Sequence, residues 1–81
     1  MGSKLKILSS DDVLRILAIF GFGIYSQKGS HIKLRRYTVD ALETLIIPNH
    51  NPIAKGTLQK IFKQASVHIS SDDLHTHFYT K

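Results

Sequence analysis

The spacing of apolar residues changes along this chain from a helical period to alternation and back, and this change limits the fold it can adopt. Over residues 11–20 apolar positions recur at i, i+3, i+4 and i+7, the pattern of one helix face. Over residues 31–37 apolar and polar side chains alternate, as in a strand with one buried face. Residues 55–65 return to helical spacing. The pattern predicts an α+β domain.

The first helix is expected over residues 11–20. It follows a Ser-Ser-Asp-Asp run at residues 9–12, whose hydroxyl and carboxylate groups suit a helix start. Gly21 and Gly23 end this helix, because glycine readily adopts the left-handed conformation that terminates helices. The second helix is expected over residues 55–65.

A second Ser-Ser-Asp-Asp run predicts a short last helix, within a C-terminal helical appendage over residues 69–79. Ser70 is expected to cap this helix, with Asp73 completing a capping box three positions later. Leu74 and Phe78 would then pack against each other one turn apart.

Three strands are expected to pair as an antiparallel meander. A turn at Gly29-Ser30 joins the first two, and Gly29 supplies the positive φ angle that the turn needs. Pro48 ends the third strand, and residues 40–43 are expected to form a loop. The strands cover residues 24–28, 31–37 and 44–47.

The resulting order is α-β-β-β-α with an optional C-terminal helix, and helices cover one face of a three-stranded antiparallel sheet. The 81 residues suffice for a single domain, with its core at residues 10–66. The chain has no cysteine, so apolar packing must hold this core. No apolar stretch reaches the roughly 20 residues of a spanning helix, so we expect a soluble, cytoplasmic protein without membrane association.

Positive charge is concentrated in the middle of the chain. The net charge is +5, and lysines and arginines outnumber acids most strongly between residues 28 and 63. Such a segment attracts nucleic acid or an acidic partner, although charge alone fits a solvated surface equally well. Its cations are Lys28, Lys33, Arg35, Arg36, Lys55, Lys60 and Lys63.

His31 is the candidate catalytic residue. If the apolar residues of the 31–37 strand face the helices, the strand period places His31, Lys33 and Arg35 together on the open face. RNA cleavage by a ribose 2′-hydroxyl needs a base, an acid and stabilising charge on the phosphorane. His31 can transfer the proton, while Lys28, Lys33 and Arg35 can hold the phosphate. The alternative, which the pattern by itself favours, is an exposed histidine with no chemical role.

Four further residues are candidates for RNA or phosphate binding. Ser30 is explained by its turn, with a phosphate contact as a secondary role. His50 lies just past the third strand and is either a polar turn residue or a second proton-transfer group. Lys60 and Lys63 lie on the solvent side of the second helix, where they are able to bind RNA or an acidic partner.

Two tyrosines and two histidines complete the candidates. Strand tyrosines usually pack in the core, but Tyr25 and Tyr37 would be able to stack on bases if they are exposed. His75 and His77 diverge by about 200° on a helix, so they do not converge on a metal ion. Neither a metal site nor a cofactor is expected.

Four motifs resemble those of the HicA-type (YcfA-like) mRNA interferase toxins of bacterial and archaeal toxin–antitoxin systems. They are Gly21-Phe22 at a helix end, the Lys-Gly-Ser-His run ending at His31, the Ile-Pro-x-His run ending at His50, and Lys-Gly-Thr-Leu-x-x-Ile-x-x-Gln-Ala over residues 55–65. The resemblance covers about residues 12–65. Ile32 stands where many members carry a second histidine.

The resemblance implies a fold like that of double-stranded-RNA-binding domains and a metal-independent endoribonuclease that cleaves mRNA and blocks translation. It also implies that His31 is the catalytic histidine and that a HicB-type antitoxin covers the active face. Two alternatives from other classes remain. One is a non-catalytic RNA-binding module that uses the same face. The other is a domain whose basic face meets only protein.

Overall fold

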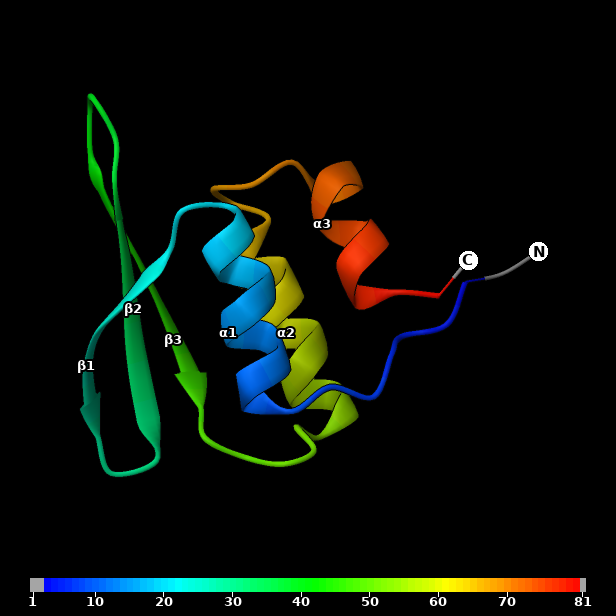
Figure 1. Cartoon of the computed structure of the whole chain (residues 1–81). Helices are drawn as coiled ribbons and strands as arrows, with labels where there is room; N and C mark the ends of the chain where they lie inside the picture. Colours follow the sequence, from blue (N-terminus) through cyan, green and yellow to red (C-terminus); the bar gives the residue numbers. More distant parts are fainter. Residues whose placement is uncertain (1–2, 81) are drawn as a thin grey trace.

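The computed structural model describes residues 3–80 and contains two layers, a three-stranded sheet and a group of helices (Figure 1). The helices lie on one side of the sheet only, and the other side is open. This arrangement confirms the expected α+β fold, α-β-β-β-α with an additional C-terminal helix. The elements are α1 Ser10–Ile19, β1 Gly23–Lys28, β2 His31–Tyr37, β3 Leu42–Pro48, α2 Lys55–Ala65 and α3 Ser71–Phe78.

Helix α1 begins with a complete capping box. The Ser9 hydroxyl accepts a hydrogen bond from the Asp12 N–H, and the Asp12 carboxylate accepts one from the Ser9 N–H. These hydrogen bonds, the backbone one foremost, hold the pKa of Asp12 below its usual value. Gly21, with φ of +92°, turns the chain out of the helix toward β1. The expected start and end of α1 are confirmed to within a residue.

The sheet is an antiparallel meander in the order β1-β2-β3, as expected. Lys28 and His31 pair across the first hairpin, so its turn consists of Gly29 and Ser30 alone. Gly29 has φ of +60°, which an L side chain adopts only with strain. The predicted turn and the function assigned to Gly29 are therefore confirmed.

The expected loop over residues 40–43 is wrong in its second half. Strand β3 already begins at Leu42, where it pairs with Tyr37, and Glu43 pairs with Arg36. These residues are in a strand because they pair with β2, and pairing with another strand cannot be predicted from local composition. The β2–β3 hairpin consequently extends beyond the helices, as its tip in Figure 1 shows.

Helix α2 has the predicted bounds, but the predicted capping box of α3 is wrong. Ser70 precedes α3 without a side-chain hydrogen bond to the helix. The helix is held instead by Leu74 and Phe78, which are fully buried, so α3 contributes to the core. No helix among residues 3–80 is long and apolar enough to cross a membrane.

The core lies between the inner face of the sheet and the helices. Strands β2 and β3 contribute side chains that are almost completely buried, whereas every residue of β1 is exposed. Strand β1 is therefore an edge strand held by its pairing with β2. The buried sheet residues are Ile32, Leu34, Leu45 and Ile47.

Candidate functional site

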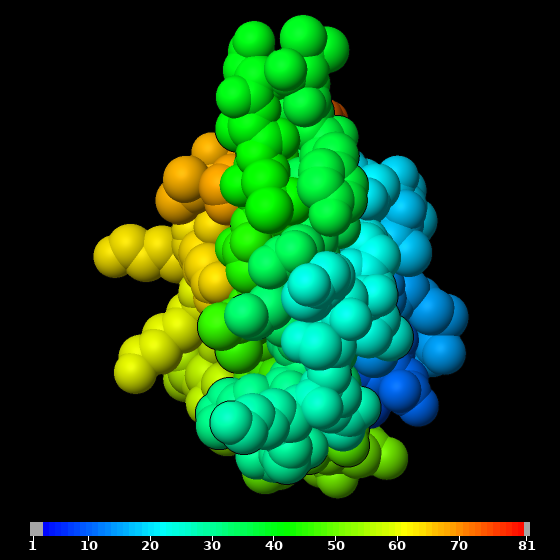
Figure 2. Space-filling model, turned by 90° about the vertical axis from the view of Figure 1, so that its left-hand side faces the viewer, coloured from blue at the N-terminus to red at the C-terminus, as the bar shows by residue number. Residues whose placement is uncertain are grey.

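Alternation along β2 separates an apolar face from a basic one. Ile32 and Leu34 are buried against the helices, so His31, Lys33 and Arg35 lie on the opposite side. Figure 2 looks at this side, which is formed mainly by the three strands. The predicted division of the strand is therefore confirmed, and we call the uncovered side the open face.

The strand register arranges the open face in rows across the sheet. Lys28 of β1 lies opposite His31, and Pro48 of β3 lies on the other side of His31. Directly opposite side chains in such pairs have Cβ atoms about 5 Å apart. Lys33 follows at about 7 Å along β2 and Arg35 at about 13 Å. The structure thus brings Lys28, His31, Lys33 and Arg35 onto one surface.

Among the residues that the structure describes, the cations of this face have no acidic partners. The ion pairs among residues 3–80 join Arg15 to Asp12 and join Arg36 and His68 to Glu43, and none involves Lys28, Lys33 or Arg35. The His31 side chain is exposed and forms no hydrogen bond with any residue that the structure describes. The positive charge of the open face is therefore free to bind an anion.

Arg35 is positioned by an aromatic ring. Its guanidinium carbon lies 3.5 Å from the centre of the Tyr25 ring, a cation–π stack. The register of β1 shifts between Ile24 and Ser26, so Tyr25 occupies a β-bulge. Tyr25 and Tyr37 are 56% and 73% exposed. Neither tyrosine is therefore part of the buried core, and Tyr25 packs on Arg35 at the surface.

A buried serine fixes the end of the sheet next to His31, and sequence reasoning missed it. The Ser10 hydroxyl accepts a hydrogen bond of 2.6 Å from the His50 N–H and lies 2.6 Å from the Pro48 carbonyl oxygen. The Ser10 N–H also donates to the His50 carbonyl at 2.9 Å. These bonds attach the start of α1 to the end of β3, whose Pro48 pairs with His31. The only sequence signal was the Ser9-Ser10 run, which we assigned to helix capping.

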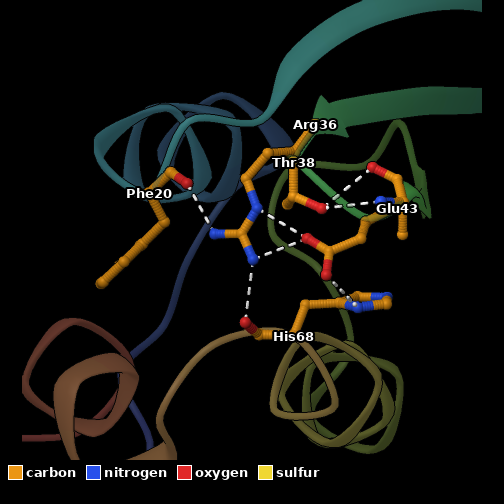
Figure 3. Close-up of polar contacts among 6 residues, drawn as sticks. Phe20, Arg36, Thr38, Glu43 and His68 are labelled. Carbon is orange, nitrogen blue, oxygen red and sulfur yellow. Dashed lines mark hydrogen bonds and ion pairs between the residues drawn. The ribbon is translucent and has the colours of Figure 1, made fainter.

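Arg36 holds the opposite end of the sheet, and its role was also missed. The guanidinium donates to the Glu43 carboxylate, to the Phe20 carbonyl at 2.9 Å and to the His68 carbonyl at 2.9 Å (Figure 3). His68 Nδ1 lies 3.3 Å from the second Glu43 oxygen. Arg36 therefore joins β2, β3, the end of α1 and the segment after α2. The sequence signal was its place on the apolar side of an alternating strand.

The remaining predicted site residues lie around the open face. Ser30 forms the turn beside His31, and its carbonyl accepts a hydrogen bond of 2.7 Å from the Asn49 N–H. The His50 side chain is exposed, but its backbone is bound to Ser10 at the start of α1, beyond the end of β3. The structure therefore keeps Ser30 at the site and turns the backbone of His50 toward the helix layer.

Helix α2 borders the free edge of β3. The Gln64 side-chain oxygen accepts a hydrogen bond of 3.2 Å from the Ile46 N–H, so Gln64 occupies an edge that another strand would otherwise pair with. Lys60 lies one turn before Gln64 on the same side of the helix. Lys60 and Lys63 are both exposed, and side chains of α2 project beside the sheet in Figure 2. Lys60 therefore extends the basic surface around this edge.

A family model described as "HicA toxin of bacterial toxin-antitoxin" matches residues 10–67 of the 81-residue chain. The chain belongs to the HicA toxin family. No curated protein and no solved structure matches it. As a HicA family member the chain is a toxin, and membership implies an antitoxin partner. The match includes the whole open face, because β1, β2 and β3 all lie inside it.

Proposed function

We propose that this HicA family member is an endoribonuclease that cleaves mRNA, with His31 as a general acid or base. The observation that carries the proposal is the row formed by Lys28 and His31, followed along β2 by the unpaired Lys33 and Arg35. A proton-transfer group thus stands beside cations that are able to hold a phosphodiester.

The reaction needs no group beyond RNA, water and these side chains. A base removes the proton of the ribose 2′-hydroxyl, and the oxygen attacks the adjacent phosphorus. The bond from phosphorus to the 5′-oxygen then breaks, and an acid protonates that oxygen, which leaves a 2′,3′-cyclic phosphate. His31 serves one of these two proton transfers, and water at the exposed face serves the other. Lys28, Lys33 and Arg35 stabilise the additional negative charge of the phosphorane.

The surrounding residues extend the RNA interface. Ser30 lies beside His31 and contributes a polar contact to phosphate. His50 and Lys60 bind the RNA strand where it leaves the sheet. Lys63 adds long-range attraction. A HicB-type antitoxin with an acidic surface would cover the open face and block this reaction in the cytoplasm, since the face carries unpaired positive charge.

Cleavage of a purified mRNA in the presence of EDTA tests the proposal. Wild type is expected to cut the RNA, and His31→Ala is expected to lose at least about 100-fold in rate, as removal of a general acid or base does. His77→Gln, on α3 and outside the open face, is the control and should cut as wild type does. His50→Ala measures the contribution of the second histidine. Absence of cleavage by wild type, or equal cleavage by His31→Ala, contradicts the proposal.

A non-catalytic RNA-binding module is the second candidate, because the unpaired cations and exposed tyrosines of the open face serve binding equally well. It predicts salt-dependent RNA binding by wild type with the RNA left intact. The cleavage assay therefore separates the two candidates.

A further inference from the structure

Arg35 stacks on Tyr25, and its N–H donors have no hydrogen-bond partner among the residues described. The Nε–H of Arg35 is buried without a hydrogen-bond partner, and its guanidinium forms no hydrogen bond or ion pair with the residues described. Stacking on Tyr25 orders the side chain without occupying its terminal N–H donors. Arg35 is therefore held in place with these donors available for phosphate or a base edge.

The bulge in β1 sets the position of Tyr25. Because the register shifts between Ile24 and Ser26, Tyr25 is the additional residue of its strand, and its ring reaches Arg35 on the middle strand. Tyr37 is exposed two residues beyond Arg35 on the same side of β2. The rings of Tyr25 and Tyr37 therefore lie beside or on β2, the strand that carries His31 and Lys33.

This combination suits an unpaired RNA strand better than a duplex. Bases in a duplex are stacked on one another, so proteins contact it through its backbone and 2′-hydroxyl groups, over about 16 base pairs for a double-stranded-RNA-binding domain. Exposed aromatic rings on an open sheet instead stack on bases that are unpaired. Cations at every second residue of β2 lie about 7 Å apart, which suits the successive phosphates of an extended strand.

We propose that Tyr25 and Arg35 form a base-stacking site on the open face, about 13 Å along β2 from His31, where a base of a single RNA strand lying along β2 stacks on the pair. The inference rests on the proposed RNA substrate and adds the residues that position it. It makes Tyr25 and Arg35 substrate-positioning residues, and it separates this protein from duplex binders that have a similar fold.

Binding of short fluorescent RNAs to the His31→Ala protein tests the inference without cleavage. A single strand is expected to bind at least about tenfold more tightly than the duplex made from it. Adding Tyr25→Leu should weaken single-strand binding about tenfold or more and leave duplex binding unchanged, whereas Tyr25→Phe keeps the ring and should bind as the parent does. Since Tyr25 is exposed, thermal unfolding should show all these variants folded.

A charge variant separates the contribution of base stacking to RNA binding from that of phosphate contact. In a plot of the logarithm of the binding constant against the logarithm of the salt concentration, Lys33→Ala should make the slope shallower by about one unit. Tyr25→Leu should leave this slope unchanged. Arg35→Lys keeps the charge and loses the planar stack, so it should resemble Tyr25→Leu more than Lys33→Ala.

The outcomes distinguish this inference from the proposed function. Cleavage by wild type together with equal single-strand and duplex affinity, or with unchanged binding by Tyr25→Leu, overturns the inference and leaves the nuclease proposal standing. The expected binding pattern without any cleavage upholds the inference and contradicts the nuclease proposal. Absence of all RNA binding overturns both.

Discussion

Replacing Arg36 by alanine is expected to lower the free energy of unfolding by about 3 kcal/mol. Removal of one partner from a buried ion pair typically costs 3–5 kcal/mol, because the other charge remains buried without compensation. The side chains of Arg36 and Glu43 are 22% and 18% exposed, so water reaches the abandoned carboxylate and the lower end of this range applies. The carbonyls of Phe20 and His68 lose their donors as well.

Thermal unfolding followed by circular dichroism at pH 7 measures this effect. For a domain of this size each kcal/mol corresponds to about 4–8 °C, so Tm should fall by about 12–24 °C. Arg15→Ala is the matched control, since it removes the same charge from a solvent-exposed pair with Asp12 and should cost about 0.5 kcal/mol or less.

A double-mutant cycle separates the pair from the rest of the Arg36 network. Glu43→Gln is expected to be less harmful in the Arg36→Ala protein than in wild type, because the interaction between the two groups is already lost there. Equal shifts in Tm for Arg36→Ala and Arg15→Ala would refute the reasoning, since burial would then make no difference.

Three further substitutions test the elements that hold the open face. Ser10→Ala should destabilise the protein by about 1 kcal/mol or more, because it leaves the partly buried N–H of His50 without its acceptor; chemical denaturation measures the loss, and a change within error contradicts the anchor. Gly21→Ala should lower Tm, since φ is +92° and the added Cβ would lie 3.3 Å from Arg36 Cδ, whereas Gly23→Ala meets no atom within 4 Å and should change Tm much less. Asp12→Asn should reduce stability at pH 7 but not at low pH: the folded carboxylate has a lowered pKa, so its contribution is present above the unfolded value near 3.8 and disappears as pH falls through the folded value. Unfolding curves of both proteins from pH 7 to pH 2 should therefore converge on acidification, and a constant difference argues against the capping box.

The elements that could be predicted from sequence are those with local determinants. The bounds of α2 followed from an uninterrupted helical stripe, and the two faces of β2 followed from alternation. The start of β3 was missed because Leu42 and Glu43 are strand residues only through their pairing with β2. Ser70 resembled a cap, yet burial of α3 makes that cap unnecessary.

The same distinction applies to the site. The period of the strand was enough to place His31 with Lys33 and Arg35 on one face. Nothing local placed Tyr25 against Arg35, because that contact depends on a bulge in a different strand. The hydrogen-bond partners of Arg36 come from three other segments, so one charged residue in an apolar pattern signalled a partner without identifying it.

Every residue of β1 is exposed, and ligand binding at the open face can be observed through this strand. No residue of β1 is buried, and neither Ser10 nor Arg36 attaches it to the helices. Its amide hydrogens should therefore exchange with solvent through local opening, well before the amides that join β2 to β3. Lys28 and Tyr25 are carried on this strand, so a ligand on the open face must hold β1 closed. Slowed exchange in β1 would then report occupation of the face by RNA or antitoxin while the remaining amides stay unchanged.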